Sequence, residues 1–454
     1  MKTKLYFLFA SIILCLSLFL RLYKIDNRAP FDWDQNRDYQ AIASIASGKL
    51  TMIGPVAKGE GGFFLGPLYY YLATPAYLLS DGSPLALPYT SVIIDILTLA
   101  AILFLLPRVW SRSGALVLAV IWTLSWYAIE NSRISWNVSL VPLWTLLMFY
   151  LLSLKSSLSY LTSLSLGVVT GLSWHIHTAL IPLSPLILVF FPQKIFSSVK
   201  NLALIVLGYF IAVLPLVVFD LRHAGLERNL IWQYFTAKAI VTPPWIMVVD
   251  SVISRFGKNI VAIFTGTSDL HFTWGALAIL ISLLSLFRRS WLARLASLFV
   301  LLNLLLVVYL RELGFPEYYL AVANLSFLIL LLDWLLSFGK IGKVATLILL
   351  LIFAFNNLRV YQIDATPFSL ARKAQIAQAV SELGDTVDLR FDLPLGRDSG
   401  IVPLMRLHQI TLSPDAPLKV IISESVAERM FIDGELTQDL GRFGGLRVSY
   451  RVVQ

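Results

Sequence analysis

The sequence predicts a polytopic α-helical membrane protein, and three observations support this fold class. The chain has 454 residues, of which 57% are hydrophobic and only 14% are charged, whereas about a quarter of the residues of a soluble protein are charged. Apolar runs of roughly 20 residues recur, and that length crosses a hydrocarbon core of ~30 Å. Trp and Tyr occur 12 and 18 times, and many of them flank the runs, as residues that anchor helices at the membrane interface do.

Hydropathy places about 11 transmembrane helices in the first four fifths of the chain. The first run follows two lysines and resembles a signal peptide, but it ends in Arg21 to Lys24 without a small-residue cleavage site. We therefore expect a retained first span. The expected spans are residues 5–23, 85–107, 113–129, 136–154, 157–175, 178–192, 201–219, 272–287, 295–310, 319–338 and 344–359.

The basic residues indicate an orientation with the N-terminus in the cytoplasm. The short outer turns then contain little beyond Arg133 and Arg311. This asymmetry fits the positive-inside rule, so we interpret the net charge of +9 as a topology signal rather than as nucleic-acid binding. The single Cys15 excludes a disulfide framework. The inner connections contain Lys2, Lys4, Arg108, Arg112, Lys155, Lys194, Lys200, Arg288, Arg289, Arg294, Lys340 and Lys343.

Three longer segments fall on the outer side: residues 24–84, 220–271 and 362–454. The last of these changes in composition and is long enough for a small α/β domain. We therefore expect a transmembrane module over residues 1–361 and an extracytoplasmic α/β domain over residues 362–454. Within that domain we expect a helix at 369–383 and strands at 387–391, 418–422 and 446–452.

A carboxylate cluster directly follows the first span. Asp34, Arg37 and Asp38 stand at i, i+3 and i+4, so they share one face if residues 34–47 form a helix on the membrane surface. Asp34 suits the N-cap, where the helix dipole favours an ionised carboxylate. A positioned, ionised carboxylate is what a general base requires. The alternative is a capped surface helix with an ion pair that serves solubility alone.

Two further outer motifs contain aromatic residues and histidines. Residues 59–66 form a glycine-rich approach to Pro67 and to three tyrosines that begin with Tyr69, which indicates an interfacial helix. Ordinary interface anchoring explains the same pattern. His175 and His177 point nearly opposite ways on a regular helix, so both face one site only if the helix breaks there. They are candidates for contact with a metal, a phosphate or a backbone carbonyl.

The remaining charged residues gather mainly on the outer side. Three further groups are Arg133, the pair Arg222 and His223, and Glu317 with Tyr318. Each can be a membrane anchor whose long side chain reaches the interface. Arginine at a lipid–water edge, however, also suits phosphate binding. Together they indicate that the outer face is the active one. Asp95 lies in the middle of a span, where a carboxylate is either functional or bonded to a neighbouring helix. Asp333 lies nearer the inner edge, and we interpret it as structural.

What the sequence lacks narrows the chemistry. It contains no phosphate-binding glycine-rich loop with Lys-Ser/Thr, no His-Glu-x-x-His zinc motif and no Gly-x-Ser-x-Gly elbow. An enzyme on the outer face without a nucleotide site needs an activated donor that is carried in the membrane. No internal repeat stands out, which disfavours an inverted-repeat transporter.

The order of these parts resembles the membrane glycosyltransferases of the GT-C superfold, in particular the group of the protein O-mannosyltransferases and lipid A aminoarabinose transferases. That group carries an acidic motif in the first outer loop, matched here by residues 34–41, and an aromatic Pro-Leu-Tyr-Tyr segment, matched by residues 63–70. His175, His177 and Tyr318-Tyr319-Leu320 also match in position. The resemblance covers residues 1–338, and residues 362–454 resemble the variable outer domain that such enzymes append.

The resemblance implies inverting transfer of a sugar from a polyprenyl-phosphate donor to an acceptor hydroxyl outside the membrane. Asp34 would be the general base, and Asp38 would orient Arg37 or replace Asp34 as base. The implied cationic partners of the leaving phosphate are Arg37, then Arg222 and His223. The implied substrate contacts are His175, His177, Tyr69 and Tyr318.

Two departures from the family pattern limit what is carried over. Gln35 replaces the usual Glu of the acidic pair, and Phe64 and Leu65 stand where the lipid A branch has Glu and Lys for metal and lipid phosphate. The cofactor therefore stays open, with a divalent metal as one option, and Lys58, Glu60 or Arg37 are the residues that could substitute. The acceptor is a protein, a lipid or a glycan. The alternatives are a secondary transporter or flippase of lipid-linked sugars, and a structural assembly protein.

Overall fold

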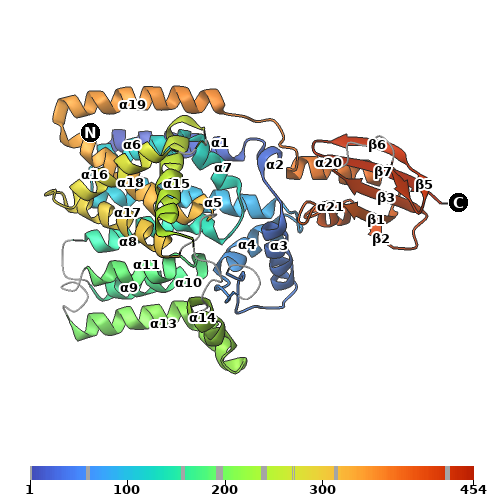
Figure 1. The fold of residues 1–454 in the computed structure, drawn as a ribbon, viewed down its shortest axis with the longest axis horizontal. Helices are drawn as coiled ribbons and strands as arrows, with labels where there is room; N and C mark the ends of the chain where they lie inside the picture. Colours follow the sequence, from blue (N-terminus) through green and yellow to red (C-terminus); the bar gives the residue numbers. More distant parts are fainter. Residues whose placement is uncertain are drawn as a thin grey trace.

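The computed structural model describes a helical bundle with a small α/β domain at one end (Figure 1). Of the residues named in the sequence analysis, Lys58, Glu60, Arg311 and Glu312 lie outside the described part of the chain. The described residues are 3–57, 62–154, 159–190, 198–236, 243–267, 269, 271–310, 315–424 and 430–453.

The bundle begins with α1 and ends with α19, which leads into the C-terminal domain. Its apolar helices are α1 (Thr3–Leu22), α5 (Ala86–Phe104), α6 (Arg112–Leu124), α7 (Trp126–Arg133), α8 (Val141–Ser153), α9 (Tyr160–Gly171), α11 (Leu180–Val189), α13 (Val199–Arg222), α16 (Phe272–Ser285), α17 (Trp291–Leu310), α18 (Ala321–Ser337) and α19 (Gly339–Val360). The shorter or more polar helices are α2 (Ile25–Arg28), α3 (Trp33–Ala46), α4 (Leu68–Leu79), η1 (Leu106–Arg108), η2 (Asn137–Leu140), α10 (Ser173–Ile176), α14 (Leu226–Thr236), α15 (Trp245–Thr265) and η3 (Glu317–Leu320).

Every expected span coincides with one of these helices or with a pair of them, but several are interrupted. In the described part of the chain, six helices are long and apolar enough to cross a membrane, or seven if α6 and α7 count as one span bent by 64°. Three further apolar helices are shorter, at Asn137–Ser153, Leu180–Val189 and Phe272–Ser285. The bend lies at Ser125, whose side chain accepts the backbone N–H of Ala128 and so caps the second half of the pair.

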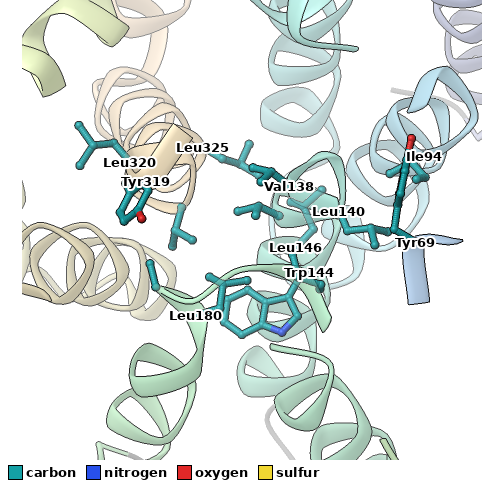
Figure 2. Close-up of a cluster of buried hydrophobic side chains, with 14 of the residues drawn as sticks. Tyr69, Ile94, Val138, Leu140, Trp144, Leu146, Leu180, Tyr319, Leu320 and Leu325 are labelled. Atoms are coloured by element: carbon teal, nitrogen blue, oxygen red, sulfur yellow. The ribbon is translucent and has the colours of Figure 1, made fainter. Parts of the chain in front are cut away.

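The core forms where α18, α8, α11, α5 and α4 converge. Figure 2 shows Leu325 lying close to Val138 in this region, and both side chains are buried. Close helix contacts elsewhere depend on glycine. A Cβ on Gly167 of α9 would collide with the carbonyl of Ile205 on α13, so the absence of a side chain lets the two backbones approach.

Two helices in the segment 220–271 were not expected from the sequence. α14 and α15 carry charged residues among their apolar ones, including Asp250, Arg255 and Lys258 on α15. A hydropathy window averages these charges with their apolar neighbours, so it passes over an amphipathic helix of this kind. α15 runs steeply across the neighbouring helices of the bundle (Figure 1).

The C-terminal domain is a mixed five-stranded sheet with two helices. The expected strands are confirmed as β1 (Thr386–Asp392), β3 (Leu418–Ser423) and β7 (Leu446–Val452), and the expected helix is α20 (Leu370–Ser381). The sheet order is β2-β1-β3-β7-β6, in which β1 is parallel to β2 and β3 and the remaining pairs are antiparallel. The other elements are α21 (Ile401–Leu407), β2 (Thr411–Leu412), β4 (Phe431–Ile432), β5 (Glu435–Leu436) and β6 (Gln438–Phe443).

Candidate functional site

The acidic segment forms α3, but its N-cap is Asp32 and not Asp34 as the sequence analysis expected. Asp32 and Gln35 make a capping box, in which the Asp32 backbone N–H donates to Oε1 of Gln35 at 3.1 Å. Gln35 also donates from Nε2 to the carbonyl of Ser135 at 3.0 Å. The residue that departs from the family pattern is therefore buried, and it fixes the start of α3 to the turn before η2. This leaves Asp34 in the first turn with its side chain half exposed.

Arg37 joins the two carboxylates of α3. Its Nη1 donates to Oδ1 of Asp34 at 2.7 Å, while Nε and Nη2 donate to Oδ1 of Asp38 at 2.9 and 2.7 Å. Asp38 is fully buried, and the Arg37 side chain is one third exposed. Solvent exposure therefore decreases from Asp34 through Arg37 to Asp38, so one carboxylate is open to solvent and the other is buried beneath the guanidinium.

The environment of Asp38 separates its chemistry from that of Asp34. Burial is the largest influence and raises the pKa of Asp38 to about 6, although the neighbouring Arg37 opposes the shift. Tyr70 on α4 is also buried, and its burial together with the nearby Asp38 carboxylate raises the pKa of Tyr70. Asp38 is thus well placed to hold Arg37, and it lacks contact with bulk water.

A cavity of about 100 Å³ opens beside Asp34 and Arg37. His177 and Tyr318 line its other side, so four of the residues singled out in the sequence meet there although they come from three separate segments. The full lining is Asp34, Arg37, Pro55, Val56, Ala57, Leu65, Trp136, Asn137, Val138, His177, Thr178, Tyr318 and Tyr319. Such a concave site with a few convergent polar groups is typical of a substrate pocket.

His177 reaches this cavity because the helix breaks before it. α10 ends at Ile176, and His177 has extended backbone angles. Its ring packs edge-on against Tyr318 and Tyr319, with centroids 5.4 and 4.5 Å apart. Burial lowers the pKa of His177 to about 4, so the ring is neutral at pH 7. Since Nδ1 accepts the backbone N–H of Ala179 at 3.2 Å, the proton of the neutral ring is on Nε2, where it is available as a donor.

His175 and Tyr69 do not line this cavity. The ring of His175 lies against Gly66, where any Cβ would collide with it, and its Nε2 lies 2.7 Å from the carbonyl oxygen of Ala212 on α13. The Tyr69 hydroxyl lies 3.3 Å from the hydroxyl of Ser91. Both side chains are buried, and they fix the glycine-rich segment and α4 behind the cavity wall.

Arg222 and His223 also lie away from the cavity, at the exposed end of α13. The His223 ring stacks on Phe219 with centroids 4.1 Å apart, and its Nδ1 lies 2.8 Å from the Phe219 carbonyl oxygen. Phe219 in turn packs edge-on against Phe64, at 5.5 Å. His223 is therefore connected to the cavity only indirectly. The contacts run from His223 to Phe219 and from Phe219 to Phe64, which precedes the cavity-lining residue Leu65.

The sequence analysis did not identify three charged groups that border this region. Glu227 on α14 is buried and accepts the backbone N–H of Phe64 at 3.2 Å, and burial raises its pKa to about 7. On α15, Arg255 and Lys258 both donate to Oε1 of Glu317, at 3.1 and 2.9 Å, directly before Tyr318. Their i, i+3 spacing is visible in the sequence, but it acquires meaning only once α15 is known to be a helix.

Two other candidates from the sequence have internal structural partners. Asp95 is paired with Arg21 of α1 at 2.5 Å and accepts the indole N–H of Trp122 at 3.0 Å. Arg133 is buried and donates to the carbonyl oxygens of Leu20 and Arg21, at 3.0 and 3.3 Å, where it caps the end of α1. Asp333 accepts the indole N–H of Trp110 at 3.1 Å, as expected for a structural residue.

The residues around Asp34 do not fit a divalent cation. The guanidinium of Arg37 already lies between the two carboxylates that would supply ligands. Over the described ranges, no group of three or more His, Cys, Asp or Glu side chains converges as metal ligands.

Comparison with known proteins places the fold. No family model and no curated protein matches the sequence. The structure of ArnT from Cupriavidus metallidurans bound to undecaprenyl phosphate superposes with a TM-score of 0.66 at 10% identity, over 99% of this chain and 98% of that one. Its apo form gives 0.63 at 12% identity, with the same coverage.

A second solved protein shares the fold over a part of its length. The apo oligosaccharyltransferase from Archaeoglobus fulgidus superposes with a TM-score of 0.52 at 14% identity, over 84% of this chain and 58% of that one. The match to ArnT extends through nearly the whole chain, and the match to the oligosaccharyltransferase covers 84% of it. The chain is therefore a multi-pass membrane protein that shares its fold with ArnT over nearly its whole length.

Proposed function

We propose that this protein transfers a sugar from a polyprenyl-phosphate donor to an acceptor hydroxyl at the outer face of the membrane. The observation that carries the proposal is the cavity in which Asp34, Arg37 and His177 meet. A base, a cation and a neutral donor are the three groups that an inverting displacement at an anomeric carbon needs. The undecaprenyl phosphate bound by ArnT, whose fold this chain shares, supports the donor class.

Asp34 is the general base in this proposal, and Asp38 is a positioning residue. Asp34 is half exposed and lines the cavity, so an acceptor hydroxyl reaches it, whereas Asp38 is buried beneath Arg37. In the reaction, the acceptor oxygen bonds to the anomeric carbon while its proton passes to Asp34. The bond from that carbon to the phosphate oxygen breaks, and the lipid phosphate leaves with the electron pair.

Cations near the cavity stabilise the charge on the leaving phosphate. Arg37 lines the cavity itself and is the first candidate. Arg255 and Lys258 come next, because Glu317 holds both beside η3 and therefore beside Tyr318. The pair Arg222 and His223 ranks third, since it lies at the exposed end of α13. His177 donates a hydrogen bond from Nε2 to an oxygen of the sugar donor or of the acceptor substrate. Tyr318 forms the wall of the cavity behind His177.

The proposed topology follows the positive-inside rule, with about 11 membrane helices. The N-terminus is cytoplasmic in this arrangement, and α3, η3 and the domain of residues 362–454 are extracytoplasmic. Residues 1–361 then form the transferase module. His175 and Tyr69 act as positioning residues for the glycine-rich segment and α4, because both make internal contacts.

The main rival, a transporter or flippase of lipid-linked sugars, needs polar groups free at the middle of the membrane. Asp95 is the carboxylate at that depth, and its partners Arg21 and Trp122 occupy both of its oxygens. The half-exposed carboxylate of Asp34 lies instead at a cavity near the C-terminal domain. This contrast favours the enzyme.

Asp34→Asn tests the proposal. We expect a loss of about 10²- to 10⁴-fold in transfer, the range for removal of a general base, with little change in thermal stability because the side chain is half exposed. The measurement is transfer of labelled sugar from a panel of polyprenyl-phosphate sugars to membrane extract by purified protein. Asp26→Asn on α2 is the matched control, because it changes an acidic residue of the same outer segment that does not line the cavity.

Two results would count against this assignment. Near wild-type turnover of Asp34→Asn, with loss in Asp38→Asn, would make Asp38 the base. Absence of transfer from every donor by folded wild-type protein would favour the transporter, and Asp95 would then be the next residue to change.

A further inference from the structure

A second cleft, which Arg37 also lines, lies next to the C-terminal domain. It has a volume of about 270 Å³ and lies between the first turns of α3 and a loop of the C-terminal domain. Its lining consists of Trp33, Asn36, Arg37, Leu395, Gly396, Asp398 and Ser399. Arg37 lines both spaces, so the cleft adjoins the proposed reaction centre at this side chain.

The helical repeat of α3 explains why two spaces meet at one arginine. Trp33, Asn36 and Arg37 stand at i, i+3 and i+4 and therefore share a face, which borders the cleft. Asp34 and Asp38 share the next face with Arg37. A molecule that fills the cleft is thus within one helical turn of the proposed base.

The two walls of the cleft are held in a fixed relation. Lys373 of α20 is buried, and its Nζ donates to the carbonyl oxygens of Phe31 and Ser399, both at 2.7 Å. It thereby ties the segment before α3 to the loop of the C-terminal domain. Gly400, with φ of +83°, packs against the Phe31 ring so closely that a Cβ would collide with it. The cleft is therefore preformed.

The side chains on the walls identify the class of ligand. Trp33 is 55% exposed and lies on the wall of the cleft, where its ring is open to a ligand. In the described part of the chain, Asn36 and Asp398 make no side-chain hydrogen bond or ion pair, although Asn36 is only partly exposed. An amide both donates and accepts, a carboxylate accepts, and the remaining N–H groups of Arg37 donate.

Neighbouring hydroxyl groups on a sugar ring both donate and accept, and the C–H bonds of the ring present an apolar face to an aromatic side chain. An extended peptide would instead need a row of backbone donors and acceptors or an apolar pocket for a side chain. We infer that the cleft between α3 and residues 395–399 is an acceptor subsite, and that the acceptor it binds is a carbohydrate. This inference rests on the proposed function for its place in the reaction.

Binding at Trp33 tests the inference without catalysis. The full-length protein is labelled with 5-fluorotryptophan, and the ¹⁹F resonance of Trp33 is assigned by its loss in Trp33→Phe. The probes are short oligosaccharides of neutral hexoses, N-acetylhexosamines and deoxyhexoses, together with a Ser/Thr-containing peptide. We expect a saturable shift of the Trp33 resonance with at least one saccharide, and none with the peptide.

Two matched controls separate specific binding from general effects. Trp232 on α14 is also strongly exposed and lies outside the cleft, so its resonance should not move. Asp398→Asn should weaken binding of the saccharide about tenfold, because it removes a charged hydrogen-bond partner, whereas Asp415→Asn on the same domain should leave binding unchanged.

Three outcomes would overturn the inference: no saturable shift with any saccharide, a shift with the peptide alone, or equal shifts at Trp33 and Trp232. Because the measurement needs no turnover, failure here leaves the Asp34→Asn result standing. If the wild-type protein is inactive but still binds a saccharide at Trp33, the proposed transfer is contradicted. The carbohydrate-binding site in the cleft would then still stand.

Discussion

Arg21 and Arg37 both pair with aspartates, and their surroundings differ in one decisive respect. Arg21 in the bundle is completely buried, and its partner Asp95 is nearly so. Arg37 on α3 pairs with a buried and a half-exposed carboxylate, is itself one third exposed, and lines two cavities. Arg21 is therefore enclosed, although its partner Asp95 borders a cavity of about 90 Å³, whereas Arg37 itself is open to a ligand.

The partners of Arg21 explain what an enclosed ion pair does in this fold. Its Nη1 and Nη2 reach the carbonyl oxygens of Thr123 and Trp122, at 3.4 and 3.0 Å, where α6 ends at the 64° bend. Carbonyls at a helix end inside a membrane have no water to satisfy them, so a buried cation is an effective cap. The comparison teaches that a charged residue within a span is a functional candidate only after its local partners have been counted.

The largest expected effect is therefore on stability, at Arg21. Arg21→Met leaves Asp95 and two carbonyls without their partner, and breaking a buried pair in this way costs about 3–5 kcal/mol. We expect a correspondingly lower free energy of unfolding in detergent, measured by denaturant titration. The proposed catalytic residues are not touched, so the turnover of the folded fraction should stay close to that of the wild type.

The double variant Arg21→Met/Asp95→Leu sharpens this result. Replacing both members of a buried pair by apolar residues is often nearly neutral, so the double variant should recover much of the loss. A double variant as unstable as Arg21→Met would show that capping of α6, and not the ion pair, is the dominant contribution.

The same contrast shows how far sequence reasoning reaches. Periodicity and hydropathy predict α3, the membrane helices and the three main strands because each depends on neighbouring residues in the chain. The triad of Asp34, Arg37 and Asp38 is visible for the same reason. The Arg21–Asp95 pair joins residues 74 positions apart, so no local pattern predicts it, and Asp95 alone is ambiguous.

The sequence analysis misplaced the N-cap of α3 and could not separate the roles of His175 and His177, and both outcomes depend on where a helix begins or ends. Asp34 was expected at the N-cap because the helix dipole favours a carboxylate there, but the cap is Asp32, because Gln35 completes a capping box with it. His175 and His177 differ by two positions, and the fate of each depends on where α10 ends. Only the tertiary structure shows that His177 reaches the cavity while His175 packs against Gly66.

The second prediction concerns Arg37, the arginine that is open to a ligand. Arg37→Lys keeps a positive charge above Asp38 but loses the planar fork that holds both carboxylates. We expect turnover to fall about 10²-fold, as for loss of one preorganised donor at a developing charge. The free energy of unfolding should change less than in Arg21→Met, because Arg37 is partly exposed and a cation remains.

Steady-state kinetics and denaturant titration of the same preparations measure both quantities. Arg397→Lys provides the control, because this residue pairs with Asp32 at 4.0 Å and lines neither space. A loss of stability as large as at Arg21, with turnover retained, would place Arg37 among the structural residues and remove the distinction between the two sites.

The smallest expected effect is a pH dependence that arises from Asp38. Burial raises its pKa to about 6, so below that pH the carboxyl gains a proton and no longer holds Arg37 by charge. We expect kcat/KM to fall about tenfold for each pH unit below the pKa. The folded state binds this proton more tightly than the unfolded chain, so protonation of Asp38 between about pH 6 and 4 stabilises the fold. The acid loss of activity should therefore occur without unfolding from this group.

Asp38→Asn should have low activity that varies little across the same range, because the asparagine copies the neutral form. The competing source is Glu227, whose pKa burial raises to about 7. An acid limb that persists in Asp38→Asn and disappears in Glu227→Gln would assign the dependence to α14 and its hydrogen bond with Phe64. In that case the buried carboxylate of α3 would behave like Asp95, as a fixed partner whose charge does not control the reaction.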